Sequence, residues 1–269
     1  MKTITFLTDF GLQDDFVGTC HGVIKTIAPD TEIIDITHGV PPQQVLQGAL
    51  VLCNTLPYMP VGVHLAVVDP GVGSHRRPLA LRTGDGRFLV GPDNGLLLPA
   101  ADTVGGVEEA HELANPEYAL DSVSRTFHGR DLFSPAAAHL SLGVAIGDLG
   151  PPIDPQALVR LDVPAPELGQ NRIRATVLYV DHFGNMQLNL KRRHLEEVGV
   201  LPGVIVELEL ALERFYATAA RTFADARAGD IILYEDSYGN IAIAISGGSA
   251  AALFGSGADD EVRIHLRTP

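Results

Sequence analysis

The 269-residue sequence contains no tryptophan and only two cysteines, Cys20 and Cys53. The cysteines lack the spacing of metal ligands and make a poor disulfide framework, so we expect a reducing, cytoplasmic compartment. No apolar run approaches the roughly 20 residues of a membrane-spanning helix. Residues 1–9 lead directly into a strand pattern. We therefore expect neither a membrane partner nor a signal peptide.

Basic residues are also scarce. The 19 lysines and arginines stand against 33 aspartates and glutamates, which gives a formal net charge of −14. Sequence-independent nucleic-acid binding requires a basic face, so this balance argues against a nucleic-acid partner. It is compatible with a cationic small ligand, and equally with a need for solubility alone. The hydrophobic share of 46% is typical of a globular protein and excludes wholesale disorder.

A connector with proline and glycine, residues 163–169, divides the chain into an N-terminal domain, residues 1–165, and a C-terminal domain, residues 166–269. Strand and helix patterns alternate in the first domain, which predicts an α/β fold with a mostly parallel sheet covered by helices. The expected strands are Ile4–Leu7, Glu32–Asp35, Val63–Val68 and a hairpin of Leu79–Arg82 with Phe88–Val90. The expected helices are Phe16–Ile27, Pro42–Leu56 and Ser134–Ser141.

The C-terminal domain has a different pattern, with short runs of valine, isoleucine and leucine separated by turn residues. Such a pattern predicts a small all-β domain, an antiparallel barrel or sandwich. The expected strands are Arg172–Asp181, Val204–Leu210, Ile231–Tyr234, Asn240–Ile245 and Val262–Leu266. We detect no internal repeat at this level.

Acidic residues follow two expected strands of the N-terminal domain. Asp9 and Asp14 come after the first strand, and Asp69 comes after the third. The carboxyl ends of strands border the ligand crevice of an open α/β sheet. A carboxylate there can accept two hydrogen bonds at once, as a ribose diol would offer. The alternative interpretation is structural, with Asp9 and Asp14 capping the helix that follows.

Cationic residues lie near Asp69 in the sequence. Arg76 and Arg77 follow it closely, and a strand-end carboxylate beside an arginine is often only a structural ion pair. His128 precedes an expected helix and is a candidate general base or water-orienting group, although a lone histidine is more often a packed or capping residue. Phosphate-binding and dinucleotide-binding glycine motifs are missing, and no histidines have the spacing of a zinc motif. We therefore expect no metal ion and no cofactor.

The C-terminal domain offers a second group of candidate residues at a strand end. Asp181 supplies a carboxylate for an ammonium group, Phe183 a ring for stacking, and Asn185 an amide that can bind a purine edge. Ser237, in an expected hairpin turn, adds a hydroxyl. The alternative is a β-turn in which Asp181 and Asn185 occupy their usual places.

Five motifs follow one another along nearly the whole chain. They are Thr8-Asp9-Phe10-Gly11, Asp69-Pro70-Gly71-Val72-Gly73 with Arg76, Gly91-Pro92-Asp93-Asn94-Gly95, Phe127-His128-Gly129-Arg130-Asp131 and Asp181-His182-Phe183-Gly184-Asn185. In this order the sequence resembles the S-adenosyl-L-methionine (SAM) hydroxide adenosyltransferases, the adenosine-forming SAM hydrolases, which are relatives of the fluorinases and chlorinases. The resemblance implies hydrolysis of SAM, as substrate and not as cofactor, to adenosine and L-methionine. It also implies an α/β domain joined to a β-barrel, and homotrimers with SAM bound between neighbouring subunits.

The resemblance further implies roles for single residues. Asp69, Arg76 and His128 match the hydrolytic set, with Arg76 preferred over Arg77 for its distance along the chain from Asp69. The substrate-binding positions match Asp9 for the ribose, Asp14 and Asp181 for the methionine ammonium, Ser237 for the methionine carboxylate, and Phe183 and Asn185 for the adenine. Tyr238 stands where the fluorinase has an arginine, which leaves its part in carboxylate recognition open.

The choice of nucleophile follows from the charge of the expected site. A fixed carboxylate at Asp69 would repel fluoride or chloride, and the halogenases carry tyrosines at the positions of Asp69 and His128. The long insertion of the fluorinases is missing as well, so we expect in-line attack by water at C5′. Because an arginine lowers the pKa of a neighbouring aspartate, we expect Asp69 to orient the water and His128, or the field of the site, to assist loss of its proton.

Two alternatives remain at this point. A chlorinase-like SAM-dependent halogenase would share the fold and the nucleoside site. A non-catalytic protein that binds SAM or adenosine would keep Asp9, Asp181 and Asn185 without needing Asp69, Arg76 and His128 together.

Overall fold

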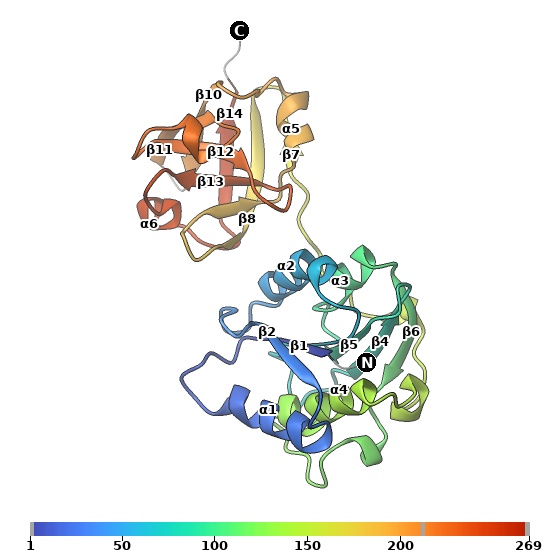
Figure 1. The fold of residues 1–269 in the computed structure, drawn as a ribbon. Coiled ribbons are helices and arrows are strands. Elements are labelled where there is room, and N and C mark those ends of the chain that lie inside the picture. Colours follow the sequence, from blue (N-terminus) through green and yellow to red (C-terminus); the bar gives the residue numbers. More distant parts are fainter. Residues whose placement is uncertain (1–2, 211–212, 267–269) are drawn as a thin grey trace. The chain divides into compact units, whose positions relative to one another are not determined.

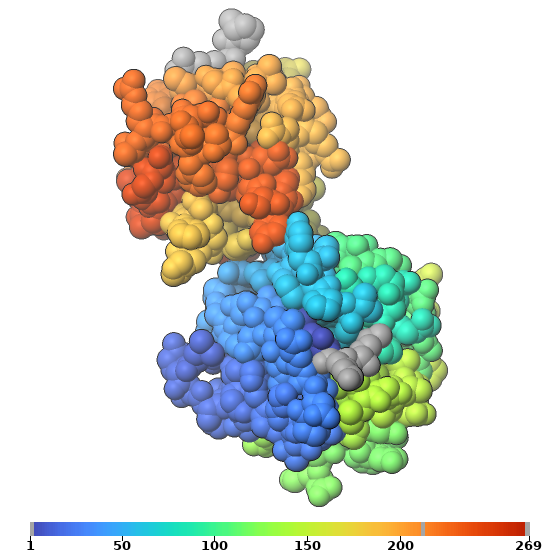
Figure 2. Space-filling view, viewed as in Figure 1, coloured from blue at the N-terminus to red at the C-terminus, as the bar shows by residue number. Residues whose placement is uncertain are grey.

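The computed structural model describes residues 3–210 and 213–266, and the chain divides into two compact units, Met1–Leu161 and Asp162–Pro269 (Figure 1). In the space-filling view, unit 1 runs from blue to yellow-green and unit 2 from yellow to red (Figure 2). Within the two described ranges, no helix has the length and apolar character that crossing a membrane requires.

The centre of unit 1 is a six-stranded sheet. Its strands are β1 (Thr3–Thr8), β2 (Glu32–Thr37), β3 (Val63–Val67), β4 (Pro78–Thr83), β5 (Phe88–Pro92) and β6 (Val107–Glu112). They lie in the order β2-β1-β3-β5-β4-β6, and the first four are parallel, while β4 is antiparallel to both β5 and β6. The prediction of a mostly parallel sheet is confirmed.

Helices cover both faces of this sheet (Figure 1). They are α1 (Phe16–Ile27), α2 (Val45–Thr55), α3 (Leu98–Thr103) and α4 (Ser134–Ser141). Phe6 belongs to the apolar cluster with α1 and α4, whereas its neighbour Leu7 belongs to the cluster with α2 and α3. Successive side chains of a strand point to opposite faces, so β1 contributes to both halves of the core.

The beginnings of two helices differ from the sequence-based expectation in an informative way. Helix α2 begins at Val45 and not at Pro42, because Gln43 has a φ of +67°, which a helix does not allow. The N-cap position of α1 is Asp15, so the interpretation of Asp9 and Asp14 as caps of this helix is wrong.

Short 3₁₀ turns complete the helical elements at η1 (Leu56–Tyr58), η2 (Pro116–Tyr118), η4 (Ile146–Leu149), η5 (Pro155–Ala157) and η6 (Phe223–Asp225).

Unit 2 is a seven-strand β-barrel with one short additional strand. Its strands are β7 (Glu167–Leu168), β8 (Arg172–Val180), β9 (Met186–Leu188), β10 (Ile205–Leu210), β11 (Glu213–Ala219), β12 (Ile231–Glu235), β13 (Ile241–Ile245) and β14 (Glu261–His265), with two short helices, α5 (Arg192–Glu197) and α6 (Ala250–Phe254). The barrel order is β14-β10-β11-β12-β13-β9-β8, and the pairing of β14 with β8 closes it. The prediction of an all-β barrel is confirmed, although β9 and β11 were not predicted. The expectation of a wholly antiparallel barrel is wrong, because β11 pairs in parallel with β12.

Two hairpins of the barrel, β8–β9 and β12–β13, have the same type of turn with the same sequence pattern. The pattern Leu-Tyr-x-Asp-x-aromatic-Gly-Asn occupies residues 178–185 and again residues 233–240, so the expectation of no internal repeat was wrong. In both copies the aspartate Oδ1 accepts hydrogen bonds from the backbone N–H groups two and four residues further on. Gly184 and Gly239 have φ of +83° and +75°, a conformation that favours glycine.

Candidate active site

Asp69 lies just beyond the carboxyl end of β3, in the loop that leads to β4. Strand β3 pairs in parallel with β1, whose end carries Asp9. The two carboxylates therefore arise from neighbouring strand ends, which the positions in the sequence had predicted. The side chain of Asp69 is only 7% exposed, so a charge on it depends on partners within the protein.

Arg76 supplies those partners. Its Nε donates to Asp69 Oδ1 at 3.1 Å, and its Nη2 donates to Asp69 Oδ2. The same Nη2 lies 3.1 Å from His128 Nδ1. The guanidinium lies over the ring of Phe133, with Cζ 5.2 Å from the ring centroid. Arg76 thus joins a carboxylate and an imidazole from two separate loops into one hydrogen-bonded set.

The contact with Arg76 determines the tautomer of His128. A guanidinium carries only donors, so His128 Nδ1 must accept this hydrogen bond through its lone pair. Burial lowers the pKa of His128, and the positive charge of Arg76 lowers it further, which favours the neutral ring. A neutral imidazole with an unprotonated Nδ1 carries its proton on Nε2. His128 is therefore a hydrogen-bond donor at Nε2 and not a free base.

The pKa of Asp69 differs from the expectation. Burial raises it above the ordinary value of 3.8, and the opposing effects of Arg76 and His128 do not cancel that rise. The prediction of a lowered pKa, which considered only the arginine, is therefore wrong. Asp69 is a better proton acceptor than an exposed aspartate paired with arginine would be.

Two glycines allow the loops of this set to approach each other closely. Gly73 has a φ of +77°, and a Cβ on it would lie 2.5 Å from the backbone oxygen of Arg125. Gly129 begins a π-helical turn, η3 (Gly129–Phe133), directly after His128, and a Cβ there would lie 2.9 Å from the ring of Phe10. A side chain at position 73 would push the loop of Asp69 and Arg76 away from the segment before His128, and one at position 129 would push the segment of His128 away from Phe10.

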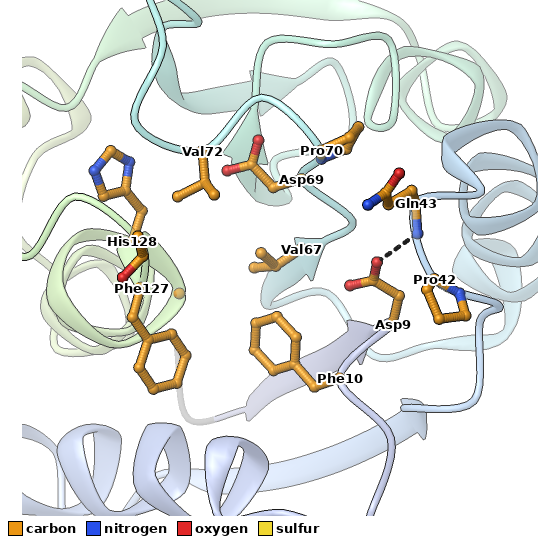
Figure 3. Close-up of a pocket in the computed structure, with 12 residues that line it drawn as sticks. Asp9, Phe10, Pro42, Gln43, Val67, Asp69, Pro70, Val72, Phe127 and His128 are labelled. Carbon is orange, nitrogen blue, oxygen red and sulfur yellow. Dashed lines mark hydrogen bonds between the residues drawn. The ribbon is translucent and has the colours of Figure 1, made fainter.

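Asp9, Asp69 and His128 line one cavity of about 300 Å³ in unit 1 (Figure 3). Its wall is completed by Phe10, Pro42, Gln43, Val67, Pro70, Val72, Thr126, Phe127 and Gly129. The backbone N–H of Gln43 donates to Asp9 Oδ2 at 2.8 Å, which holds that carboxylate at the edge of the cavity. The cavity therefore presents the carboxylates of Asp9 and Asp69 and the imidazole of His128 against a largely apolar wall.

Arg77 has a different role from its neighbour. Its Nε and Nη2 donate to Asp93, and its Nη2 also donates to the backbone oxygen of Ala157. Asp93, whose side chain is 3% exposed, also accepts from the backbone N–H of Val159. Arg77 thus fastens the segment around Val159 to the end of β5, and only Arg76 contacts Asp69.

The second group of predicted residues lies in unit 2. Asp181, Phe183 and Asn185 line a cavity of about 720 Å³ together with Phe223, Ile245, Gly247, Gly248 and Ser249. Asp181 Oδ2 accepts from the Asn185 side-chain amide at 2.7 Å, and its Oδ1 accepts from two backbone N–H groups. Asp181 and Asn185 therefore stabilise a turn, as the β-turn interpretation predicted. Phe183 projects freely, with 74% of its surface exposed.

Three predicted residues line neither cavity: Arg76, which contacts Asp69 and His128, and the exposed residues Asp14 and Ser237. Asp14 is exposed in the loop between β1 and α1, and it makes no hydrogen bond or ion pair with any residue that the structure describes. Ser237 is exposed in the turn between β12 and β13.

The repeated turn also reveals polar residues that the sequence reasoning missed. Asp236, the counterpart of Asp181, accepts from Gln187 Nε2, whose own Oε1 is buried without a partner among the described residues. Burial is the main cause that raises the pKa of Tyr179 and of Tyr234 to about 12, and the charges of Asp181 and Asp236 contribute to the same rise. The repeat Leu-Tyr-x-Asp-x-aromatic-Gly-Asn was the signal that could have found this cluster.

Comparison with known proteins gives matches over both units. Residues 4–150 match the SAM hydroxide adenosyltransferase N-terminal domain, and residues 175–263 match the C-terminal domain of that family. An (R)-S-adenosyl-L-methionine hydrolase of Salinispora tropica is 49% identical over 261 residues, covering 97% of each chain. A fluorinase of Actinoplanes sp. is 29% identical over 270 residues, covering 90% of each. The crystal structure of an uncharacterized conserved protein from Thermotoga maritima has a TM-score of 0.89 and 35% identity, covering 98% of this chain and 100% of that one.

The contact between Arg77 and Asp93 predicts a loss of stability on substitution. Arg77→Ala leaves the buried Asp93 carboxylate with a single backbone donor, so we expect the free energy of unfolding to fall by about 2 kcal/mol. Arg160→Ala is the matched control, because Arg160 and Asp102 form an exposed pair, which is worth less than about 1 kcal/mol. Denaturant unfolding of both variants measures the difference. Equal losses would contradict a structural role for Arg77.

Proposed function

The chain belongs to the SAM hydroxide adenosyltransferase family, and we propose that it hydrolyses SAM to adenosine and L-methionine with Asp69, Arg76 and His128 as catalytic residues. The higher identity to a SAM hydrolase than to a fluorinase supports hydrolysis. The assignment of the residues is carried by one observation, the hydrogen-bonded set of Asp69, Arg76 and His128 beside a cavity that Asp9 also lines.

The reaction is a displacement at C5′ of the adenosyl group. A water oxygen forms a bond to C5′ while the C5′–S bond breaks, and the electron pair of that bond stays on sulfur. The sulfonium makes methionine a neutral leaving group, so departure needs no protonation. The enzyme has to hold one water in line with the C5′–S bond and to receive the proton that this water releases.

Asp69 receives that proton. Its carboxylate oxygens have lone pairs beyond those used by Arg76, and burial raises its pKa towards that of an effective base. His128 donates from Nε2 to the water oxygen, which directs a lone pair of the water away from the ring. Arg76 holds both groups in place and favours the negative charge that develops on the oxygen. This division of roles reverses the one that the sequence suggested.

Asp9 binds the ribose. Its Oδ2 is held by the backbone N–H of Gln43, and its Oδ1 faces no such donor in the described structure. The carboxylate can therefore accept from the ribose hydroxyls in a fixed orientation. Since Asp9 and Asp69 come from neighbouring strand ends, the sugar and its reacting carbon are held by the same edge of the sheet.

The remaining substrate contacts come from unit 2 and from the loop after β1. Phe183 stacks on the adenine, and Asn185 hydrogen-bonds to its edge. Asp181 and Asp14 bind the methionine ammonium, and Ser237 binds the methionine carboxylate. Supporting this, Asp181, Phe183 and Asn185 already share one cavity, and Asp181 Oδ2, which accepts only from the Asn185 amide among the described residues, has a second lone pair left.

The active protein is a homotrimer in which unit 1 of one subunit and unit 2 of its neighbour complete each site. The predicted residues fall into two groups that line two different cavities, one in each unit. Neither cavity has the groups for both the reacting carbon and the adenine. A shared site gives each group its counterpart, and closed threefold symmetry makes all three sites equivalent.

The roles of Asp69 and Asp9 predict that substituting Asp69 lowers turnover, whereas substituting Asp9 weakens ligand binding. Asp69→Asn keeps the shape but removes the proton acceptor, so we expect turnover to fall by about 10²–10⁴-fold while SAM binding stays within a few fold. Asp9→Asn is the matched variant, for which binding of SAM and of adenosine should weaken together, because both carry the diol. Chromatography of adenosine and methionine gives turnover, and calorimetry gives binding.

Four results would contradict these assignments. Unchanged turnover of Asp69→Asn would remove the proposed base. Loss of SAM binding alone in Asp9→Asn would remove the ribose contact. Formation of 5′-chloro-5′-deoxyadenosine in concentrated chloride would favour a halogenase, and bound but unchanged SAM would favour a protein that only binds it.

The pKa shifts of the site predict how activity depends on pH. Catalysis needs Asp69 ionised and His128 neutral, and falling pH removes both conditions. The pKa of His128 is lowered from 6.5 and that of Asp69 is raised from 3.8, so the loss of kcat/KM on acidification should have its midpoint between these values. A midpoint at or above 6.5, measured from initial rates, would contradict this.

A site shared between subunits predicts complementation. Asp69→Asn is defective in unit 1, and Phe183→Ala is defective in unit 2, where Phe183 is exposed and not needed for the fold. After subunit exchange between the two, activity at low SAM should exceed the sum of the parent activities and approach about a quarter of the wild-type value, because a quarter of the sites combine two intact units. Activity equal to the sum, or sedimentation of an active monomer, would contradict the shared site.

A further inference from the structure

A second cluster of potential ligands lies between α1 and β2, apart from the cavity of Figure 3. His21 of α1, Asp35 of β2 and His38, which follows β2, place one ligand atom each within 4.8 Å of one another. His21 Nε2 and His38 Nε2 lie 2.9 and 3.1 Å from the same oxygen, Asp35 Oδ1. None of the three residues lines the catalytic cavity.

The strongest indication of a missing ligand is the Nε2 atom of His38. The side chain of His38 is 3% exposed, yet this nitrogen has no hydrogen-bond partner within the described residues, because Asp35 is near but not aligned. Buried polar atoms without a partner are rare, and one that points into a cluster of metal-ligating groups calls for a ligand. Asp35 and His21, at 42% and 31% exposed side-chain surface, leave the cluster open to solvent.

The surroundings of His38 hold it as a metal ligand would be held. Its Nδ1 lies 2.8 Å from the hydroxyl oxygen of Thr8, which also accepts from the backbone N–H of Phe10. A hydroxyl has two lone pairs, so it can accept both, which leaves the Nε2 lone pair of a neutral His38 free. A hydrogen bond from the other ring nitrogen is the usual support of a ligating histidine.

Packing also fixes the direction of the two rings. Both imidazoles lie against the buried ring of Phe6, with centroid distances of 5.8 Å for His21 and 4.8 Å for His38. The two imidazoles therefore converge on Asp35 from a rigid support. A site with two imidazoles and one carboxylate, open at a fourth position, suits zinc with one bound water.

We propose that His21, Asp35 and His38 form a binding site for a divalent transition-metal ion of the zinc type. His21 lies within α1, 14 residues before Asp35 of β2, which is why no zinc spacing appears in the sequence. Thr8 directly precedes Asp9, so an ion at this site also fixes the strand end that carries the ribose-binding carboxylate. The site does not depend on the proposed function.

Zinc titration of the full chain without a histidine tag tests the site. After chelator treatment, isothermal titration should give one zinc ion per chain, and cobalt should give the visible absorption of a tetrahedral N₂O₂ site. His21→Gln and Asp35→Asn should weaken zinc binding by about 100-fold or more, since even outer-shell partners are worth about 10–100-fold. His194→Gln is the control, a histidine of α5 in unit 2.

The readouts distinguish the site from adventitious binding. Zinc should raise the melting temperature of the wild type and of His194→Gln, and should leave that of Asp35→Asn unchanged. Equal zinc affinity in the wild type and in both ligand variants, or no cobalt absorption in the wild type, would overturn the proposal. The wild-type cobalt spectrum decides even if a variant folds poorly.

Discussion

The bidentate hydrogen-bonded ion pair between Arg76 and Asp69 is the contact on which the rest of the site depends. Both side chains are more than nine-tenths buried, and a guanidinium does not lose its proton in a protein. Each charge is therefore tolerated because the other is present, and removing either leaves an isolated charge away from water. A pair of this kind adds little to stability. What it fixes is position, because two N–H donors in one plane hold the carboxylate in one orientation.

The same arginine decides which partner is acid and which is base. Since Nη2 can only donate, His128 is an acceptor at Nδ1 and a donor at Nε2. The carboxylate is left as the group with free lone pairs, and its raised pKa follows from burial that the arginine does not fully offset. Considering the ion pair alone led to the opposite division of roles. Desolvation has to be weighed against the pair before a base can be assigned.

The sequence predicted most of the fold because its local signals agree with its tertiary structure. Helices α1 and α4 have their predicted bounds, and strand-end acids marked the edge of the sheet. Strand β9 is too short for periodicity to reveal, and the positive φ of Gln43, which makes α2 begin later than predicted, is invisible without neighbouring structure.

For the site, a spacing argument chose Arg76 over Arg77, and the structure gives the two arginines different partners, Asp69 for Arg76 and Asp93 for Arg77. No spacing could indicate His21, Asp35 and His38, which meet only because α1 packs beside β2.

The separation of chemistry from recognition explains how one architecture is compatible with different nucleophiles. A hydrolase and a fluorinase both match this chain over most of its length, at 49% and 29% identity. In the proposed function the barrel and its repeated turns contact the nucleoside and the amino acid, which do not change when the nucleophile does. In the proposed mechanism the nucleophile is selected by the few groups next to C5′, which are a carboxylate, a guanidinium and an imidazole donor. Such a set compensates its own charge and offers a proton acceptor, which water needs and a halide ion does not.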